Sequence, residues 1–132
     1  MSEERLNYYD PIEEKLNVIS HAFGLVLSVI ALVLLVIFAS LEGSVWHIVS
    51  FSIYGASLII LYAASTFYHN SKTPKLRYRL NIFDHASIYV LIAGTYTPVS
   101  LVIIGGSLGW LIFSIVWTIA IVGIIFKSIF CF

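Results

Sequence analysis

Apolar residues gather in four long runs that are separated by short polar segments. The runs cover about residues 18–41, 45–68, 83–104 and 108–126. About 20 mostly apolar residues are needed to cross the hydrocarbon core of a bilayer, and each run is close to that length. Backbone polar groups must be paired internally in lipid, so each run is expected to be helical. The pattern predicts an all-α fold, a polytopic membrane bundle with four transmembrane helices.

Composition supports the membrane class. The chain of 132 residues is 60% hydrophobic and 11% charged, whereas a soluble domain usually carries about 25% charged residues. The formal net charge is zero, so nothing indicates a nucleic-acid partner, and the expected partner is the lipid bilayer. Cys131 is the single cysteine and cannot form a disulfide within the chain.

The polar segments predict the domain organisation. Residues 1–16 are expected to form an N-terminal tail, with Asp10-Pro11 as a helix start, and residues 17–132 form the membrane domain. The segment 70–81 is interpreted as a loop, because Pro74 would block helix continuation. Pro98 lies inside the third run and is expected to kink it.

Basic residues predict the orientation. Four spans place the tail, the 70–81 loop and the C-terminus on one side of the membrane. Cytoplasmic segments carry an excess of Lys and Arg, so the N-terminus is expected in the cytoplasm and the protein in the cell membrane as a multi-pass protein. The side so assigned holds all seven basic residues: Arg5, Lys15, Lys72, Lys75, Arg77, Arg79 and Lys127.

Candidate chemistry gathers where the second run ends and the third begins. Ser65 and His69 are four residues apart and share one helix face, and Asp84 returns to a similar depth. An imidazole beside a carboxylate suits Zn²⁺, with Asp84 either as a ligand or orienting a water that Ser65 also contacts. The alternative is that these residues meet lipid headgroups or cap helices, with Asp84 capping the third helix.

The other three histidines differ from His69 in their depth in the membrane or in the direction of their side chains. His21 lies about one turn inside the basic boundary and is either a packing residue or a ligand. His85 points about 100° away from Asp84 on a helix. His47 begins the second run, about 33 Å from His69 along the helix axis, and is excluded from a shared site.

Three motifs resemble those of the hemolysin III family, which is related to the progestin and adipoQ receptors. Residues 14–24 (EKLNVISHAFG) are similar to its E-x-x-N-x-x-x-H-x-x-G entry to the first helix. Residues 65–69 (STFYH) are similar to S-x-x-x-H. Residues 83–98 begin with FDHASIY and end with GTYTP, similar to D-x-x-x-I followed by G-[TS]-[YF]-x-P.

The resemblance implies seven membrane helices with the N-terminus inside, of which four are present here. It also implies that His69 is a zinc ligand, that Asp84 lies near the metal and its water, that Ser65 lies one turn before the ligand, and that His21 is supporting. The family's further ligands form an H-x-x-x-H pair on its last helix, and no two histidines here are four apart. We therefore expect a partial zinc site in a chain whose reading frame is truncated at the C-terminal side. The alternatives are that a partner chain supplies the other ligands, or that the site is inactive.

Three functions remain open at this stage. The resemblance implies a zinc-dependent hydrolase-like protein or one of membrane-lipid homeostasis, acting on a lipid substrate. The alternatives are a cytolysin (hemolysin) acting on membranes and a receptor-like membrane protein without catalysis. No amphipathic helix with a charged stripe marks a pore, because the runs are apolar on nearly all faces.

Overall fold

The computed structural model describes residues 9–130, which fold into four long helices. Asp10 caps the first helix, where its Oδ1 accepts a hydrogen bond of 2.9 Å from the Ile12 backbone N–H. A π-helical segment, η2, extends the third helix. The elements are α1 (Pro11–Glu42), α2 (Val45–Asn70), α3 (Pro74–Pro98), η2 (Val99–Ile104) and α4 (Gly106–Phe130). The all-α prediction is confirmed.

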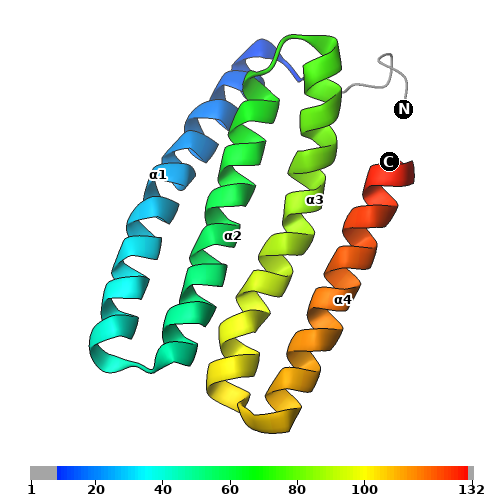
Figure 1. The fold of residues 1–132 in the computed structure, drawn as a ribbon. Coiled ribbons are helices and arrows are strands. Elements are labelled where there is room, and N and C mark those ends of the chain that lie inside the picture. Colours follow the sequence, from blue (N-terminus) through cyan, green and yellow to red (C-terminus); the bar gives the residue numbers. More distant parts are fainter. Residues whose placement is uncertain (1–8, 131–132) are drawn as a thin grey trace.

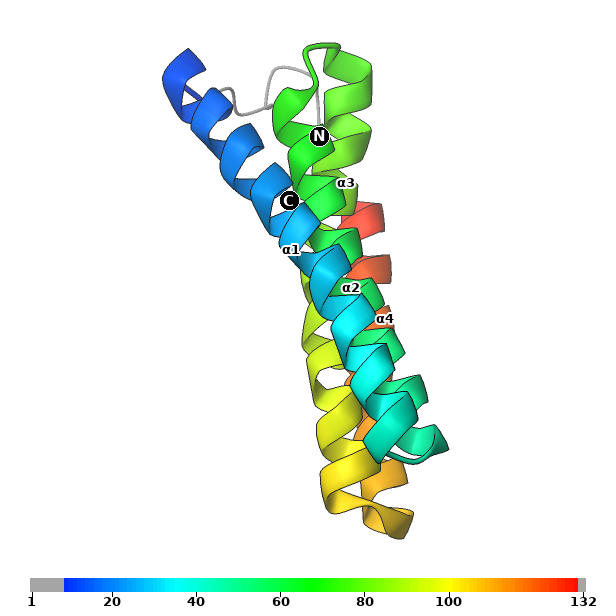
Figure 2. The same cartoon turned by 90° about the vertical axis from the view of Figure 1, so that its left-hand side faces the viewer.

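The helices lie side by side in chain order (Figure 1). Packing contacts within residues 9–130 join α1 to α2, α2 to α3, and α3 with η2 to α4. Seen from the side, the four helices overlap in one column, and the first turns of α1 diverge from α2 and α3 (Figure 2). The described chain is therefore a single layer of helices with two broad faces.

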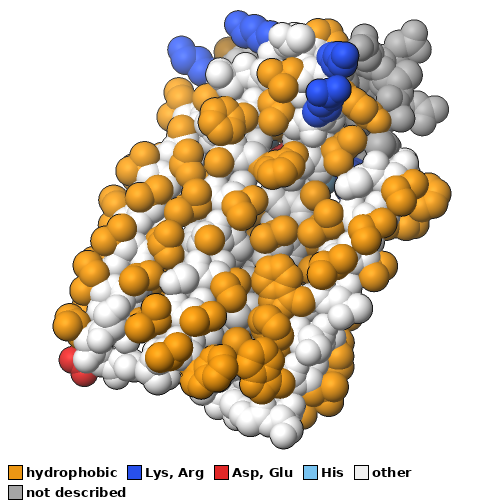
Figure 3. Space-filling view, in the orientation of Figure 1, with side chains coloured by type: hydrophobic (Ala, Val, Ile, Leu, Met, Phe, Trp, Pro, Cys, Tyr) orange, Lys and Arg blue, Asp and Glu red, His pale blue; other side chains and the backbone are white. Residues whose placement is uncertain are grey.

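The surface is that of a membrane protein. Large apolar side chains point outward over much of the molecule (Figure 3), while the buried positions are mostly small residues such as Ala64, Ala93, Ser50 and Ser57. Small residues at interfaces let membrane helices approach closely, and lipid replaces the missing hydrophobic core. Each of the four helices is long and apolar enough to cross a membrane.

The third helix begins earlier than expected. The prediction of a loop over 70–81 is wrong, because α3 begins at Pro74 and only residues 71–73 connect it to α2. Proline fits the first turn of a helix, where its missing N–H would have no partner, so Pro74 starts a helix here. Asp84 consequently lies in the helix interior, and its interpretation as a helix cap is wrong.

Pro98 changes the helix type. Proline has no N–H to donate within the helix, and after it the chain forms η2, whose last bond joins the Gly105 N–H to the Ser100 carbonyl at 2.9 Å. Gly105 and Gly106 then adopt φ of 67° and 60°. These left-handed conformations suit glycine and turn the chain into α4.

Charge is concentrated at one end of the layer. The start of α1, the end of α2, the 71–73 connection, the start of α3 and the end of α4 together form what we call the basic end, which carries Lys15, Lys72, Arg77 and Lys127. On the face drawn in Figure 3, the Lys and Arg side chains gather at this end. The opposite end carries Glu42 and His47.

Candidate functional site

One face of α1 carries the first set of polar residues at the basic end. Glu14, Asn17 and His21 are spaced three and four residues apart, so they line up along one side of the helix. The cap at Asp10 starts α1 before the apolar run, which makes Glu14 part of the first turn. The chain thereby places a carboxylate, an amide and an imidazole against α2.

Glu14 joins the three helices of this end. Its Oε2 accepts a hydrogen bond of 2.8 Å from Nδ1 of His69 on α2, and its Oε1 pairs with Nη2 of Arg77 on α3. The exposed fractions of the Glu14, His69 and Arg77 side chains are 17%, 9% and 1%. Charge-assisted bonds in such partly buried positions are stronger than those in water.

Arg77 is held from several directions. Its Nη1 donates to the Tyr68 carbonyl at 3.1 Å and to the Ser71 carbonyl at 3.2 Å, at the end of α2. The Tyr68 carbonyl also accepts the Ser71 backbone N–H. Its guanidinium lies 4.5 Å from the centroid of the Tyr68 ring. A buried cation needs such compensation, and the position of Arg77 in the first turn of α3 makes it possible.

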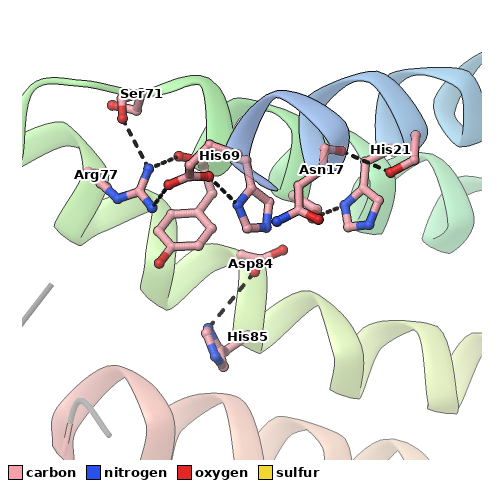
Figure 4. A network of polar contacts seen from close by, with 11 residues as sticks. Asn17, His21, His69, Ser71, Arg77, Asp84 and His85 are labelled. Carbon is pink, nitrogen blue, oxygen red and sulfur yellow. Dashed lines mark hydrogen bonds and ion pairs between the residues drawn. The ribbon is translucent and has the colours of Figure 1, made fainter. Parts of the chain in front are cut away.

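The orientation of His69 follows from Glu14. With Nδ1 directed at the carboxylate, the other ring nitrogen faces the space where Asn17 and Asp84 point (Figure 4). A carboxylate on Nδ1 fixes the tautomer that leaves a lone pair on Nε2. His69 therefore presents this lone pair to a cation on that side.

His21 and Ser65 extend the cluster along the helices. Nδ1 of His21 shares a hydrogen bond with Oγ of Ser65, and the rings of His21 and His69 lie 5.7 Å apart at 76°. Ser65 also faces Asp84 closely enough for a side-chain hydrogen bond. Ser65 thus lies between an imidazole of α1 and a carboxylate of α3.

Asp84 is the contribution of α3 to the cluster. It interacts electrostatically with His85, His69 and His21. His85 lies on the other side of α3: its ring is 45% exposed, and Nδ1 lies 2.8 Å from the Asn81 carbonyl (Figure 4). The structure brings Ser65, His69, Asp84 and His21 together and leaves His85 at the margin.

His47 is remote from this cluster, as predicted. It lies in the first turn of α2, where Nδ1 accepts a hydrogen bond of 3.1 Å from the Ser44 backbone N–H. It caps its own helix at the opposite end of the layer, so it takes no part in the site.

The described residues do not complete a metal site. No group of three or more His, Cys, Asp or Glu within residues 9–130 is arranged to hold an ion, and a zinc site takes three or four protein ligands. His69 with Asp84 fits one side of such a site in donor chemistry.

Sequence reasoning missed Glu14 and Arg77 as site residues. The sequence analysis interpreted Glu14 only as the first residue of a motif, and Arg77 only as one of the basic residues of the predicted 70–81 loop. Two signals were available: the three-and-four spacing of Glu14, Asn17 and His21 from a capped start, and Pro74 as a first-turn residue. Together they place Glu14 and Arg77 within one turn of their helix starts at the same end.

Four membrane-length helices with a polar cluster at one end define an integral membrane protein. A family model described as "Haemolysin-III related" matches residues 9–132, and the chain belongs to this family. It is 48% identical over 118 residues to "Hemolysin-3" of Bacillus cereus, covering 89% of this chain and 54% of that protein. It is 50% identical over 118 residues to "Hemolysin-3 homolog" of Bacillus subtilis (strain 168), covering 89% and 55%.

The chain spans about half the length of these curated relatives. No solved structure matches it. These matches confirm the expected family.

Proposed function

We propose that this chain is part of a zinc-dependent membrane hydrolase or lipid-homeostasis protein, whose polar cluster faces the cytoplasm and meets a lipid substrate. The observation that carries the proposal is the position of His69, with Nδ1 on Glu14 and its other nitrogen toward Asp84. Metal-ligating histidines commonly donate their second N–H to a carboxylate in this way. The remaining ligands would come from residues beyond those described here.

Each residue has a role in this proposal. His69 would bind zinc through Nε2, and Glu14, itself held by Arg77, would keep the ring in place. The metal would supply a Lewis acid that activates water. Asp84 would orient that water and exchange protons with it, and Ser65 would donate a hydrogen bond to it. His21 would support Ser65 through their shared hydrogen bond.

The orientation is part of the proposal. The positive-inside rule puts the basic end in the cytoplasm, which is supported by the concentration of Lys and Arg at that end. A lipid of the inner leaflet could then reach the cluster from the membrane, because the first turns of α1 diverge from the other helices (Figure 2).

Elemental analysis tests the zinc assignment. A version of the chain that continues to the length of its relatives, purified in detergent, is expected to hold about one zinc. His69→Ala should remove most of it, while His47→Ala, the matched control at the opposite end, should leave it unchanged. Zinc content that is the same in all three proteins would overturn the assignment. Loss of turnover of ceramide-like or phospholipid substrates in Asp84→Asn would support the hydrolase reading.

A cytolysin is the second candidate, and the names of the two relatives favour it. Leakage of dye from liposomes discriminates between the two. Leakage caused by purified protein in the presence of a chelator would favour the cytolysin, and its absence would count against it.

A further inference from the structure

A pocket of about 690 Å³ opens beside α1 at the basic end. Glu14 and His69 form the wall that it shares with the polar cluster, while Asn17, His21 and Asp84 lie outside its lining. On α1 the pocket is lined by Pro11, Glu14, Lys15, Val18 and Ile19. Of these, Lys15 and Ile19 face away from Asn17, whereas Glu14 and Val18 lie next to the side that carries Asn17 and His21. The pocket therefore adjoins the polar cluster across Glu14, His69 and Arg77, and its other lining residues have no role in the proposed hydrolase chemistry.

The pocket is positively charged. Lys15, Lys72 and Arg77 line it together with a single carboxylate, that of Glu14, which leaves an excess of two positive charges among these four side chains. Glu14 is paired with Arg77. The Lys15 and Lys72 side chains are exposed and line the pocket, one from α1 and one from the 71–73 connection. An anion entering here would meet two lysines from two different segments.

The rest of the lining is apolar. Tyr9, Pro11, Val18 and Ile19 supply it, and Ile19 belongs to the outward-facing side chains that contact lipid acyl chains in a membrane. A phosphate ion has no apolar surface to contact these residues. An amphiphile has both a charged headgroup for the lysines and an apolar part for the apolar lining. Basic pockets between membrane helices at the headgroup level are a known form of lipid recognition.

We propose that this pocket binds the phosphate headgroup of an anionic phospholipid, with Lys15 and Lys72 on the phosphate and the glycerol and first acyl carbons against Val18 and Ile19. Lys15, Lys72, Val18 and Ile19 have no role in the proposed zinc chemistry, so this lipid binding requires no zinc, while the pocket shares its Glu14 and His69 wall with that site. It gives the first turns of α1, which diverge from the other helices (Figure 2), a lipid molecule as a packing partner.

Spin-labelled phosphatidylglycerol and phosphatidylcholine, each exchanged into vesicles that contain the full chain, test the proposal. The chain should prefer phosphatidylglycerol, and K15Q/K72Q should lower the relative association constant at least ~10-fold, since each lysine near the surface adds to the attraction for anionic lipid. The matched control is K75Q/R79Q, which removes the same charge from exposed positions of the same end that do not line the pocket. It should lower the constant by a clearly smaller factor than K15Q/K72Q, because Lys75 and Arg79 act on the lipid only through the general surface potential and do not line the pocket.

Three results would overturn the proposal. Equal losses in the two double variants would mean a general surface attraction with no defined site, and no loss in K15Q/K72Q would exclude the lysines. Adding millimolar glycerol phosphate, with chloride at the same ionic strength as the control, distinguishes a lipid phosphate from a soluble phosphate as the ligand. The measurement is the displacement of the spin-labelled lipid. The lipid should stay bound; displacement of the labelled lipid would mean that the pocket takes a soluble phosphate.

Discussion

His69 and Glu14 are 55 positions apart in the chain, and Nδ1 of the first lies 2.8 Å from Oε2 of the second. This bond ties the first turn of α1 to the last turn of α2. Because the same carboxylate also pairs with Arg77 at the start of α3, one side chain holds three helix ends together. The packing of the basic end and the orientation of His69 therefore depend on Glu14.

Glu14→Gln should lower the free energy of unfolding by about 2–4 kcal/mol. The amide keeps the size of the side chain but removes its charge, so the buried Arg77 guanidinium loses its counter-charge, and breaking one side of a buried pair is costly. Unfolding in mixed micelles with increasing SDS measures the effect.

The neighbouring Glu13→Gln is the matched control. Glu13 is exposed in the same helix turn, so its substitution should change the free energy of unfolding by less than about 0.5 kcal/mol. Equal effects of the two substitutions would contradict the role given to Glu14.

Gly94→Ala should push α2 and α3 apart. A Cβ at this position would overlap Oγ of Ser57 and lie 2.8 Å from its Cβ, and overpacking of this kind costs about 1–3 kcal/mol. Ser57→Gly removes the clashing atoms, so the double variant G94A/S57G should recover most of the loss. The four proteins form a double-mutant cycle, and strictly additive effects would show that the two residues do not meet.

Cysteine labelling tests the orientation. In a Cys131→Ser background, Ser44→Cys places a thiol at the opposite end and Lys72→Cys places one at the basic end, both at exposed positions. If the basic end is cytoplasmic, a membrane-impermeant maleimide should label Ser44→Cys in intact cells and Lys72→Cys only after permeabilisation. The reverse pattern would mean that the chain is inverted in the membrane.

Much of the fold could be predicted because the bilayer leaves few options. An apolar run such as residues 18–41 is long enough only for a membrane helix, and all four predicted runs lie within observed helices. The start of α3 could not be read from apolarity, because residues 74–82 are polar enough to resemble a loop. Only the first-turn preference of Pro74 indicated a helix there.

The site was predictable in part. His69, Ser65 and Asp84 stood out because they are polar residues at the ends of apolar runs, and the structure brings them to one end of the layer. His21 could not be assigned, since a lone histidine on a helix has no partner in the sequence. Its contact with Ser65 arises from the crossing of α1 and α2.

The sequence by itself determined the membrane class, the number of spans in this chain, the family and the end at which the polar residues gather, because each depends on residue type and order along the chain. The tertiary structure decided which polar groups meet. Glu14 reaches both His69 and Arg77 only because three helix ends come to the same level. That alignment is set by the packing of small residues between helices, and no local pattern in the chain encodes the pairing.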